Sequence, residues 1–90
     1  MTHDGAKKRA AEAAVDECLK DGQKVGLGTG STAVWAVRHI GQLLEDGTVR
    51  DIRAVATSSQ SLLEAQQLGI PLRSINDPEI GGTLDVAFDG

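Results

Sequence analysis

A glycine-rich segment, VGLGTGSTA, occupies residues 25–33 and separates two stretches of different periodicity. Before it, Lys24 to Gly28 is short and apolar, which indicates a buried strand. After it, Ser31 to Leu44 carries apolar residues at helical spacing, which indicates an amphipathic helix. The segment therefore predicts a buried strand that turns through glycines directly into a helix, a unit typical of α/β proteins.

Helix and strand signals alternate along the rest of the chain as well. Asp4 to Lys20 is rich in alanine and carries its apolar residues on one face, which predicts a first helix. Ile52 to Ala56 predicts a second strand, and the Ser/Thr cluster at residues 57–59 can cap a further helix. Beyond that helix, Ile70 to Ile75 predicts a third strand despite a proline, and Leu84 to Phe88 predicts a fourth.

Strands joined by helices of this length imply crossover connections and parallel pairing. We therefore expect an α/β fold, a Rossmann-like three-layer domain with a mostly parallel sheet, which residues 1–90 leave incomplete. In such sheets ligands bind beyond the carboxyl ends of the strands. Polar residues follow three predicted strands, at 28–32, at 57–59 and at Asp89 with Gly90, and one crevice can gather all three.

Charge and composition limit the classes of partner. Thirteen acidic residues against nine basic ones give a net charge of −4, which argues against binding to nucleic acid or an anionic membrane surface. No window approaches the ~18 apolar residues of a membrane span and no signal-peptide pattern is present, so we expect a cytoplasmic protein. Cys18 is the only cysteine, which excludes an internal disulfide, and its apolar neighbours predict that it is buried.

The glycine loop is suited to hold a small anion. A strand-to-helix loop exposes backbone N–H groups that have no partner within the helix, and the helix dipole adds partial positive charge. Gly28 and Gly30 allow positive φ and a close approach to the main chain, and Thr29, Ser31 and Thr32 add hydroxyl groups. Phosphate fits this chemistry, although the same residues would also make a tight turn with ordinary helix caps.

The spacing argues against two other phosphate-binding motifs. A Walker A loop needs Gly-Lys-Ser/Thr, and no lysine follows Gly30. A dinucleotide-binding loop needs G-x-G-x-x-G; Gly26 and Gly28 supply the first pair, but position 31 is Ser31. We therefore do not expect nucleoside-triphosphate hydrolysis, and dinucleotide binding is the weaker alternative.

Five segments, in order and spacing, resemble the N-terminal portion of type A ribose-5-phosphate isomerase. They are KKRAAEAAV, VGLGTGSTA, AVATSSQS, LGIPL and DVAFDG, and they run through nearly the whole chain. The family interconverts ribose 5-phosphate and ribulose 5-phosphate in the non-oxidative pentose phosphate pathway, with no metal or organic cofactor. The resemblance implies that residues 1–90 are the N-terminal part of an α/β sugar-phosphate isomerase domain, whose partner is a sugar phosphate.

The resemblance also implies which residues meet the substrate. It assigns the phosphate to the loop formed by Thr29, Gly30, Ser31 and Thr32. Lys8, at the start of the first helix, is a further candidate phosphate contact; the alternative is a solvated lysine in a basic run. Family members are commonly oligomeric, so the resemblance implies a homo-oligomer.

Asp89 is the catalytic candidate. In the family this strand continues as Asp-Gly-Ala-Asp-Glu, and its aspartates assist ring opening and proton transfer, which implies that Asp89 and Gly90 contact the sugar. The second aspartate, a lysine-glycine segment and the glutamate base of the family are not among these 90 residues, so we expect the chain alone to be inactive. Residues 57–59 would border the same cleft or serve only as helix caps. The alternative role of Asp89 is that of a turn residue. Asp85 is expected to face outward or to lie at an edge.

A sugar-phosphate-sensing domain of a transcriptional regulator is the competing function. Such domains have a similar fold and glycine loop and bind the phosphate without turning the sugar over. They need a DNA-binding helix-turn-helix ahead of this domain, whereas a single helix is predicted here before the first strand.

Overall fold

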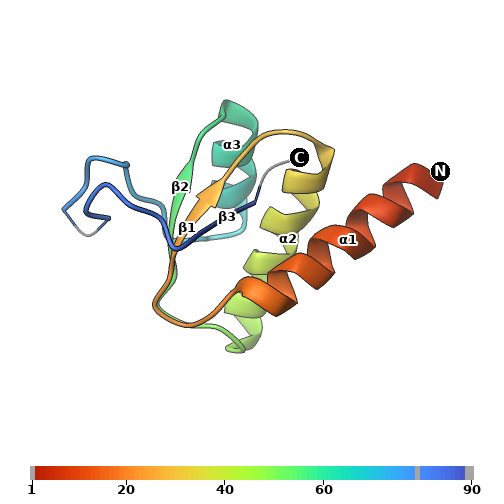
Figure 1. The fold of residues 1–90 in the computed structure, drawn as a ribbon, viewed down its shortest axis with the longest axis horizontal. Helices are drawn as coiled ribbons and strands as arrows, with labels where there is room; N and C mark the ends of the chain where they lie inside the picture. The colour runs from red at the N-terminus through yellow and green to blue at the C-terminus, as the bar shows by residue number, and fades with distance from the viewer. Residues whose placement is uncertain (1, 79, 89–90) are drawn as a thin grey trace.

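The computed structural model describes residues 2–78 and 80–88. Its elements follow one another as α1 (Thr2–Cys18), β1 (Lys24–Leu27), α2 (Ser31–Asp46), β2 (Arg53–Ala56), α3 (Ser59–Gln67) and β3 (Val86–Phe88). The alternation predicted from the sequence is confirmed (Figure 1), with boundaries that differ by a few residues.

The three strands form one parallel sheet in the order β2-β1-β3. Val25 of β1 lies in register with Ala54 on one side and with Val86 on the other. The chain passes from β1 through α2 to β2, and later returns to the opposite side of β1 to form β3. The strand order therefore reverses between β1 and β3, which is where open α/β sheets form their ligand crevice.

The helices pack on one face of this sheet (Figure 1). α1 lies against α2, and α2 against α3, so that the helices form a single layer. Val25 and Leu27 of β1 face this layer and are fully buried, together with Val15 of α1 and Ile40 of α2. The apolar faces predicted for the first two helices are thus the faces that build the core.

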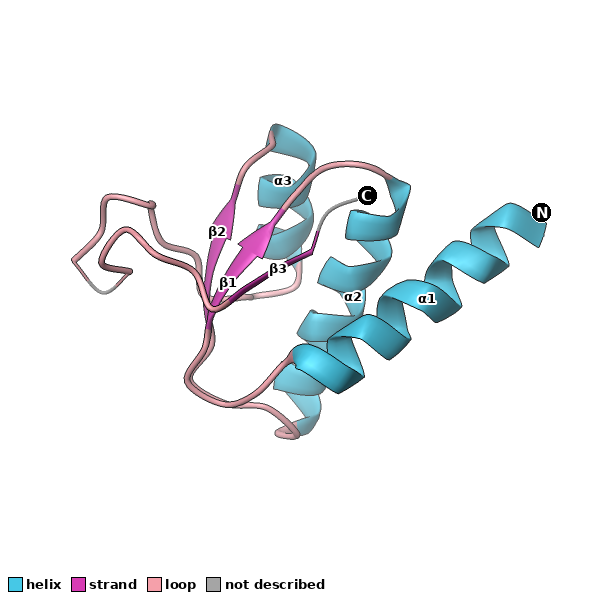
Figure 2. Cartoon of the chain, viewed as in Figure 1, coloured by secondary structure: helices cyan, strands magenta, loops and turns pink. Residues whose placement is uncertain are grey.

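The long connection between residues 74 and 85 lies apart from the helices (Figure 2). Gly26 of β1 alternates with its inward neighbours, and a Cβ at this position would lie 2.8 Å from Leu84 Cδ1. Ile80, in the same connection, is fully buried. The second face of the sheet is therefore approached by this irregular segment in the part of the chain that the structure describes.

One predicted strand is absent. Residues 70–75 make only an isolated bridge between Leu72 and Ala54 of β2, with hydrogen bonds from Ala54 N–H to Pro71 and from Arg73 N–H to Ala54. The chain then turns, since the Asp77 N–H donates to the Ser74 carbonyl at 2.9 Å. The prediction of a strand over Ile70 to Ile75 was wrong because the chain leaves the edge of β2 as soon as one residue has paired.

The predicted burial of Cys18 was also wrong, since its side chain is exposed. The buried row is Ala11 and Val15 of α1 and Leu19 directly after it, spaced four residues apart. Cys18 follows Ala14 in the neighbouring row, where Ala14 is only half-buried and burial ends before Cys18 is reached.

The fold is that of an open parallel sheet with helices on one face, which confirms the Rossmann-like α/β class. Of the three layers expected, the described residues form the sheet and one helix layer. No helix in this part of the chain is long and apolar enough to cross a bilayer.

Candidate anion-binding site

The glycine loop lies at the reversal of strand order. β1 ends at Leu27, and the next residue, Gly28, donates its N–H to the carbonyl of Phe88 at 2.8 Å. Phe88 is the last residue of β3. The loop therefore starts beside the carboxyl end of β3 and rises from there to the start of α2 (Figure 1).

Gly30 ends the loop as the N-cap of α2, with φ 101° and ψ 166°. This conformation is rare for residues with a Cβ, which explains why glycine occupies the position. The Gly30 carbonyl accepts from the Val34 N–H at 3.1 Å, so the helical hydrogen bonds begin here. The N–H groups of residues 31–33 precede the first such bond, and they point toward the carboxyl edge of the sheet with the positive end of the helix dipole.

Two hydroxyl groups donate hydrogen bonds to carbonyl groups where β1 ends and the loop begins. The carbonyl of Leu27 accepts from both the N–H and the Oγ1 of Thr57, at 2.9 and 3.0 Å. The carbonyl of Gly28 accepts from the hydroxyl of Ser61, which is fully buried. The end of β1 is thereby tied to the end of β2 and to α3.

The Ser/Thr cluster divides its roles between loop and helix. Ser58 is the N-cap of α3, and its Oγ accepts from the Ser61 N–H at 3.2 Å, which confirms the predicted cap. Thr57 contacts the loop as described, and Ser59 is exposed. Ser61 was missed by sequence reasoning. The available signal was a serine three residues after a cap and four residues before Ala65, on the same face of the predicted helix.

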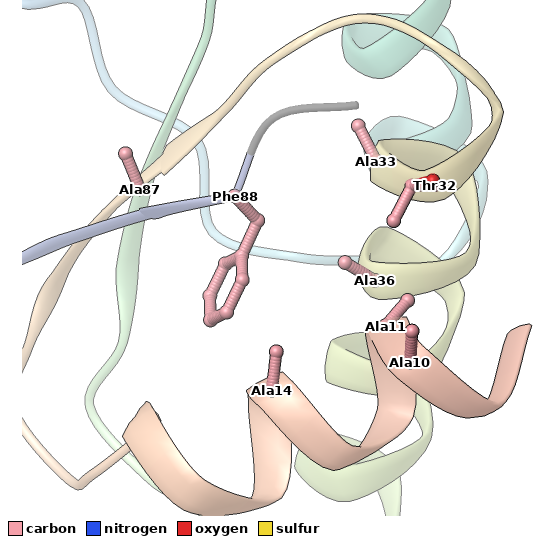
Figure 3. A pocket seen from close by; sticks show the side chains of 8 residues that line it. All are labelled: Ala10, Ala11, Ala14, Thr32, Ala33, Ala36, Ala87 and Phe88. Atoms are coloured by element: carbon pink, nitrogen blue, oxygen red, sulfur yellow. The ribbon is translucent and has the colours of Figure 1, made fainter. Parts of the chain in front are cut away.

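A cavity of about 220 Å³ opens between α1, the first turns of α2 and the end of β3 (Figure 3). Its lining consists of small apolar side chains with one hydroxyl and one aromatic ring: Ala10, Ala11, Ala14, Thr32, Ala33, Ala36, Ala87 and Phe88. The Phe88 ring points toward Ala14, across from α2. Thr32 belongs both to the predicted loop and to the lining of this cavity, so the loop borders an apolar cavity.

Lys8 is exposed and lies beside α2. Its Nζ is 5.6 Å from the centre of the Trp35 ring, and Arg38 Cζ lies 5.1 Å from the same ring. Trp35 is one helical turn beyond the start of α2. Lys8 thus lies next to α2, the helix that follows the loop, through a cation–π contact that was not predicted from the sequence.

The remaining predicted residues are placed as follows. Thr29 is exposed and Gly30 half-buried at the tip of the loop. The side chain of Ser31, and all of Asp89 and Gly90, lie outside the described part of the structure. Phe88, the residue before Asp89, is beside Gly28, as the shared hydrogen bond shows.

Fold and loop together define an open Rossmann-like α/β protein with a glycine-capped helix N-terminus at its strand-order reversal. No protein-family model matches the chain. Ribose-5-phosphate isomerase A of Treponema denticola is 47% identical over 89 residues, which cover 93% of this chain and 37% of that protein.

Comparison with solved structures also finds ribose 5-phosphate isomerases. A ribose 5-phosphate isomerase from Plasmodium falciparum superposes with a TM-score of 0.89 at 37% identity, over 97% of this chain and 36% of that one. A D-ribose-5-phosphate isomerase in complex with phospho-erythronic acid gives a TM-score of 0.85 at 38% identity, over 93% of this chain and 35% of that one. The chain is therefore a homologue of ribose-5-phosphate isomerase A, and it spans about a third of the length of these relatives.

Proposed function

We propose that residues 1–90 are the N-terminal, phosphate-binding part of an α/β sugar-phosphate isomerase domain that interconverts ribose 5-phosphate and ribulose 5-phosphate. The observation that carries the proposal is the glycine-capped start of α2 at the reversal between β1 and β3. The relatives named for this reaction, one of them bound to a phosphorylated sugar acid, support the choice of substrate.

The loop would act as the phosphate handle. Backbone N–H groups at the start of α2 would bind the phosphate oxygens, with hydroxyl donors from Thr29, Ser31 and Thr32. Gly30 admits the phosphate close to the main chain because it has no Cβ. Lys8 would add positive charge from α1, at the expense of its contact with Trp35.

Holding the phosphate fixes the sugar so that its reacting end lies toward the end of β3. Isomerisation removes the proton from C2, passes through an enediolate and returns a proton to C1, while a hydroxyl proton moves from O2 to O1. Asp89 would assist ring opening and these proton transfers, with Gly90 beside the sugar. Phosphate binding positions the substrate but does not replace the carboxylate base, so we expect no turnover by the 90 residues alone. No cofactor enters the proposed reaction.

We also propose a cellular setting, which follows from the family resemblance. The assembled enzyme would be a cytoplasmic homo-oligomer whose ligand is a small sugar phosphate, with no role for nucleic acid or membrane. The net charge of −4 suits this setting, since the only anion-binding feature proposed is local.

A chimera tests the function. This chain would replace the matching segment of the Treponema denticola relative, and ribulose 5-phosphate formation would be measured. We expect an active chimera in which Asp89→Asn lowers kcat by about 10² or more, and Ser31→Ala raises KM by about tenfold with a smaller effect on kcat.

The unaltered relative and a Gln67→Ala chimera, changed at an exposed residue of α3 far from the loop in sequence, serve as controls. The dissociation constant of ribose 5-phosphate, measured on the 90-residue chain, separates binding from turnover. A chimera that binds the sugar phosphate but never converts it would refute the isomerase and favour the sensor. A chimera that neither binds nor converts the sugar phosphate would refute both the isomerase and the sensor.

A further inference from the structure

Ser61 is the one buried polar side chain among the described residues, and it contacts the glycine loop from outside. It belongs to α3, whose remaining buried residue is Ala65. Its backbone N–H is already satisfied by the Ser58 cap at 3.2 Å, so its hydroxyl is not needed to start the helix. The hydroxyl instead donates to the carbonyl of Gly28, 33 positions earlier in the chain.

This contact determines how one peptide of the loop is turned. The Gly28–Thr29 peptide is trans, and in a trans peptide the C=O and the N–H point in opposite directions. Because the Gly28 carbonyl is directed to Ser61, the Thr29 N–H is directed to the side of the loop away from α3. The preceding peptide is held in the same way, with the Leu27 carbonyl on Thr57 and the Gly28 N–H on Phe88.

We propose that Ser61 is a positioning residue for phosphate binding, which presets the orientation of the Gly28–Thr29 peptide and with it the course of the glycine loop into α2. This inference rests on the proposed function of the loop. Preset donors bind an anion without reorganisation at the moment of binding, which is where such a residue would contribute. Without the hydroxyl, the Gly28 carbonyl would lose its buried partner and the peptide could rotate.

The test compares Ser61→Ala with Ala65→Gly in the 90-residue chain. Both residues are fully buried in α3, but only Ser61 touches the loop. Ribose 5-phosphate, and separately inorganic phosphate, would be titrated while the amide NMR signals of Gly28 to Thr32 are followed, and unfolding in urea would be measured on each variant.

We expect Ser61→Ala to weaken the binding of both ligands by about tenfold, the size expected when one buried hydrogen bond is lost. Ala65→Gly should lower stability but leave the affinity of the folded chain within about twofold. In the unliganded chain the Thr29 amide signal should move in Ser61→Ala and stay in place in Ala65→Gly. Ser61→Thr, which keeps the donor, should restore the Thr29 signal and most of the affinity.

Four outcomes would overturn the inference. Equal affinity of folded Ser61→Ala and the parent chain would do so, as would equal losses in Ser61→Ala and Ala65→Gly. If Ser61→Ala does not fold, Ser61→Cys retains the volume with a weaker donor and should bind at an intermediate level; parent-like binding there would contradict Ser61 positioning. If the parent itself binds neither ligand, the phosphate-binding function fails and the role of Ser61 falls with it, whereas parent binding without a Ser61 effect refutes only the inference.

Discussion

Two glycines near the loop carry opposite constraints at the scale of the residue. Gly30 is needed for its backbone conformation, with φ 101° and ψ 166°. Gly26 has no such requirement and is needed for space, because a Cβ there would lie 3.2 Å from the Cβ of Ala87 and 2.8 Å from Leu84 Cδ1. Substitution by alanine should therefore disturb the two positions for different reasons.

Gly30→Ala should lower the free energy of unfolding by about 1–3 kcal/mol and weaken ribose 5-phosphate binding. With a Cβ at position 30, either the backbone keeps its positive φ under strain or the start of α2 shifts. Gly47→Ala is the matched control, since Gly47 caps the other end of α2 at φ 78° with open space around it. The control should lose about 1 kcal/mol without a change in affinity. Urea unfolding and ligand titration check both, and an unchanged affinity in Gly30→Ala would contradict the proposed loop geometry.

Gly26→Ala should cost about 1–3 kcal/mol through overpacking against Leu84 and Ala87. The Leu84 methyl can move aside, whereas Ala87 belongs to the paired strand β3. Adding Leu84→Ala should therefore recover only part of the loss. A double-mutant cycle in urea measures the coupling, and strictly additive losses would show that the two side chains do not compete for this space.

At the scale of the element, β3 is the shortest strand and is attached at its start by a side chain. The Asp85 N–H donates to the Lys24 carbonyl at 2.8 Å, and Asp85 Oδ2 accepts from the Lys24 N–H at 2.8 Å. The sequence predicted only that Asp85 faces outward or lies at an edge, and its side chain is exposed. The structure adds that its carboxylate continues the β1–β3 ladder for one more residue. The position of β3 matters because Phe88 accepts the hydrogen bond that starts the loop.

Asp85→Ala should destabilise the chain by about 1 kcal/mol, because the Lys24 N–H loses its acceptor. Asp85→Asn keeps an acceptor oxygen in nearly the same shape and should lose less. Amide hydrogen exchange provides the local measurement. The Gly28 N–H, which donates to Phe88 of β3, should exchange faster in Asp85→Ala. Identical exchange in the two variants would show that the carboxylate does not hold β3.

At the scale of the whole molecule, 90 residues bury a limited fraction of their surface, on the order of 60–65%, so stability is small and a bound ligand should be visible in it. The single helix layer and the open sheet edges add to this expectation. Ligand binding and stability are therefore linked in a way that thermal unfolding can detect.

Ribose 5-phosphate at about 100 times its Kd should stabilise the chain by about 2.7 kcal/mol and raise Tm on the order of 10 °C. Ribose without the phosphate is the control and should have little effect, because the loop provides a handle for the phosphate alone. Calorimetry or far-ultraviolet dichroism measures the shift. Equal stabilisation by ribose would show that the sugar, and not the phosphate, is recognised here.

Local patterns sufficed to predict the helices, the paired strands and the glycine loop. Helical spacing identified the buried face of α2, a serine cluster identified the cap of α3, and the glycines with hydroxyl residues identified the loop, because each of these depends on residues close in the sequence. The failures arose where distant residues decide. The segment at 70–75 has strand propensity, but only its departure from β2 determines how much of it pairs.

The sequence by itself thus determined the α/β class, the order of the elements and the loop chemistry, since propensity, periodicity and motif spacing are local properties. Only the tertiary structure decided that β3 lies beside β1, that Ser61 reaches Gly28 and that Lys8 rests on Trp35. The physical reason is that these contacts join segments separated by tens of residues, whose meeting depends on which side of the sheet each crossover takes and on how the core packs.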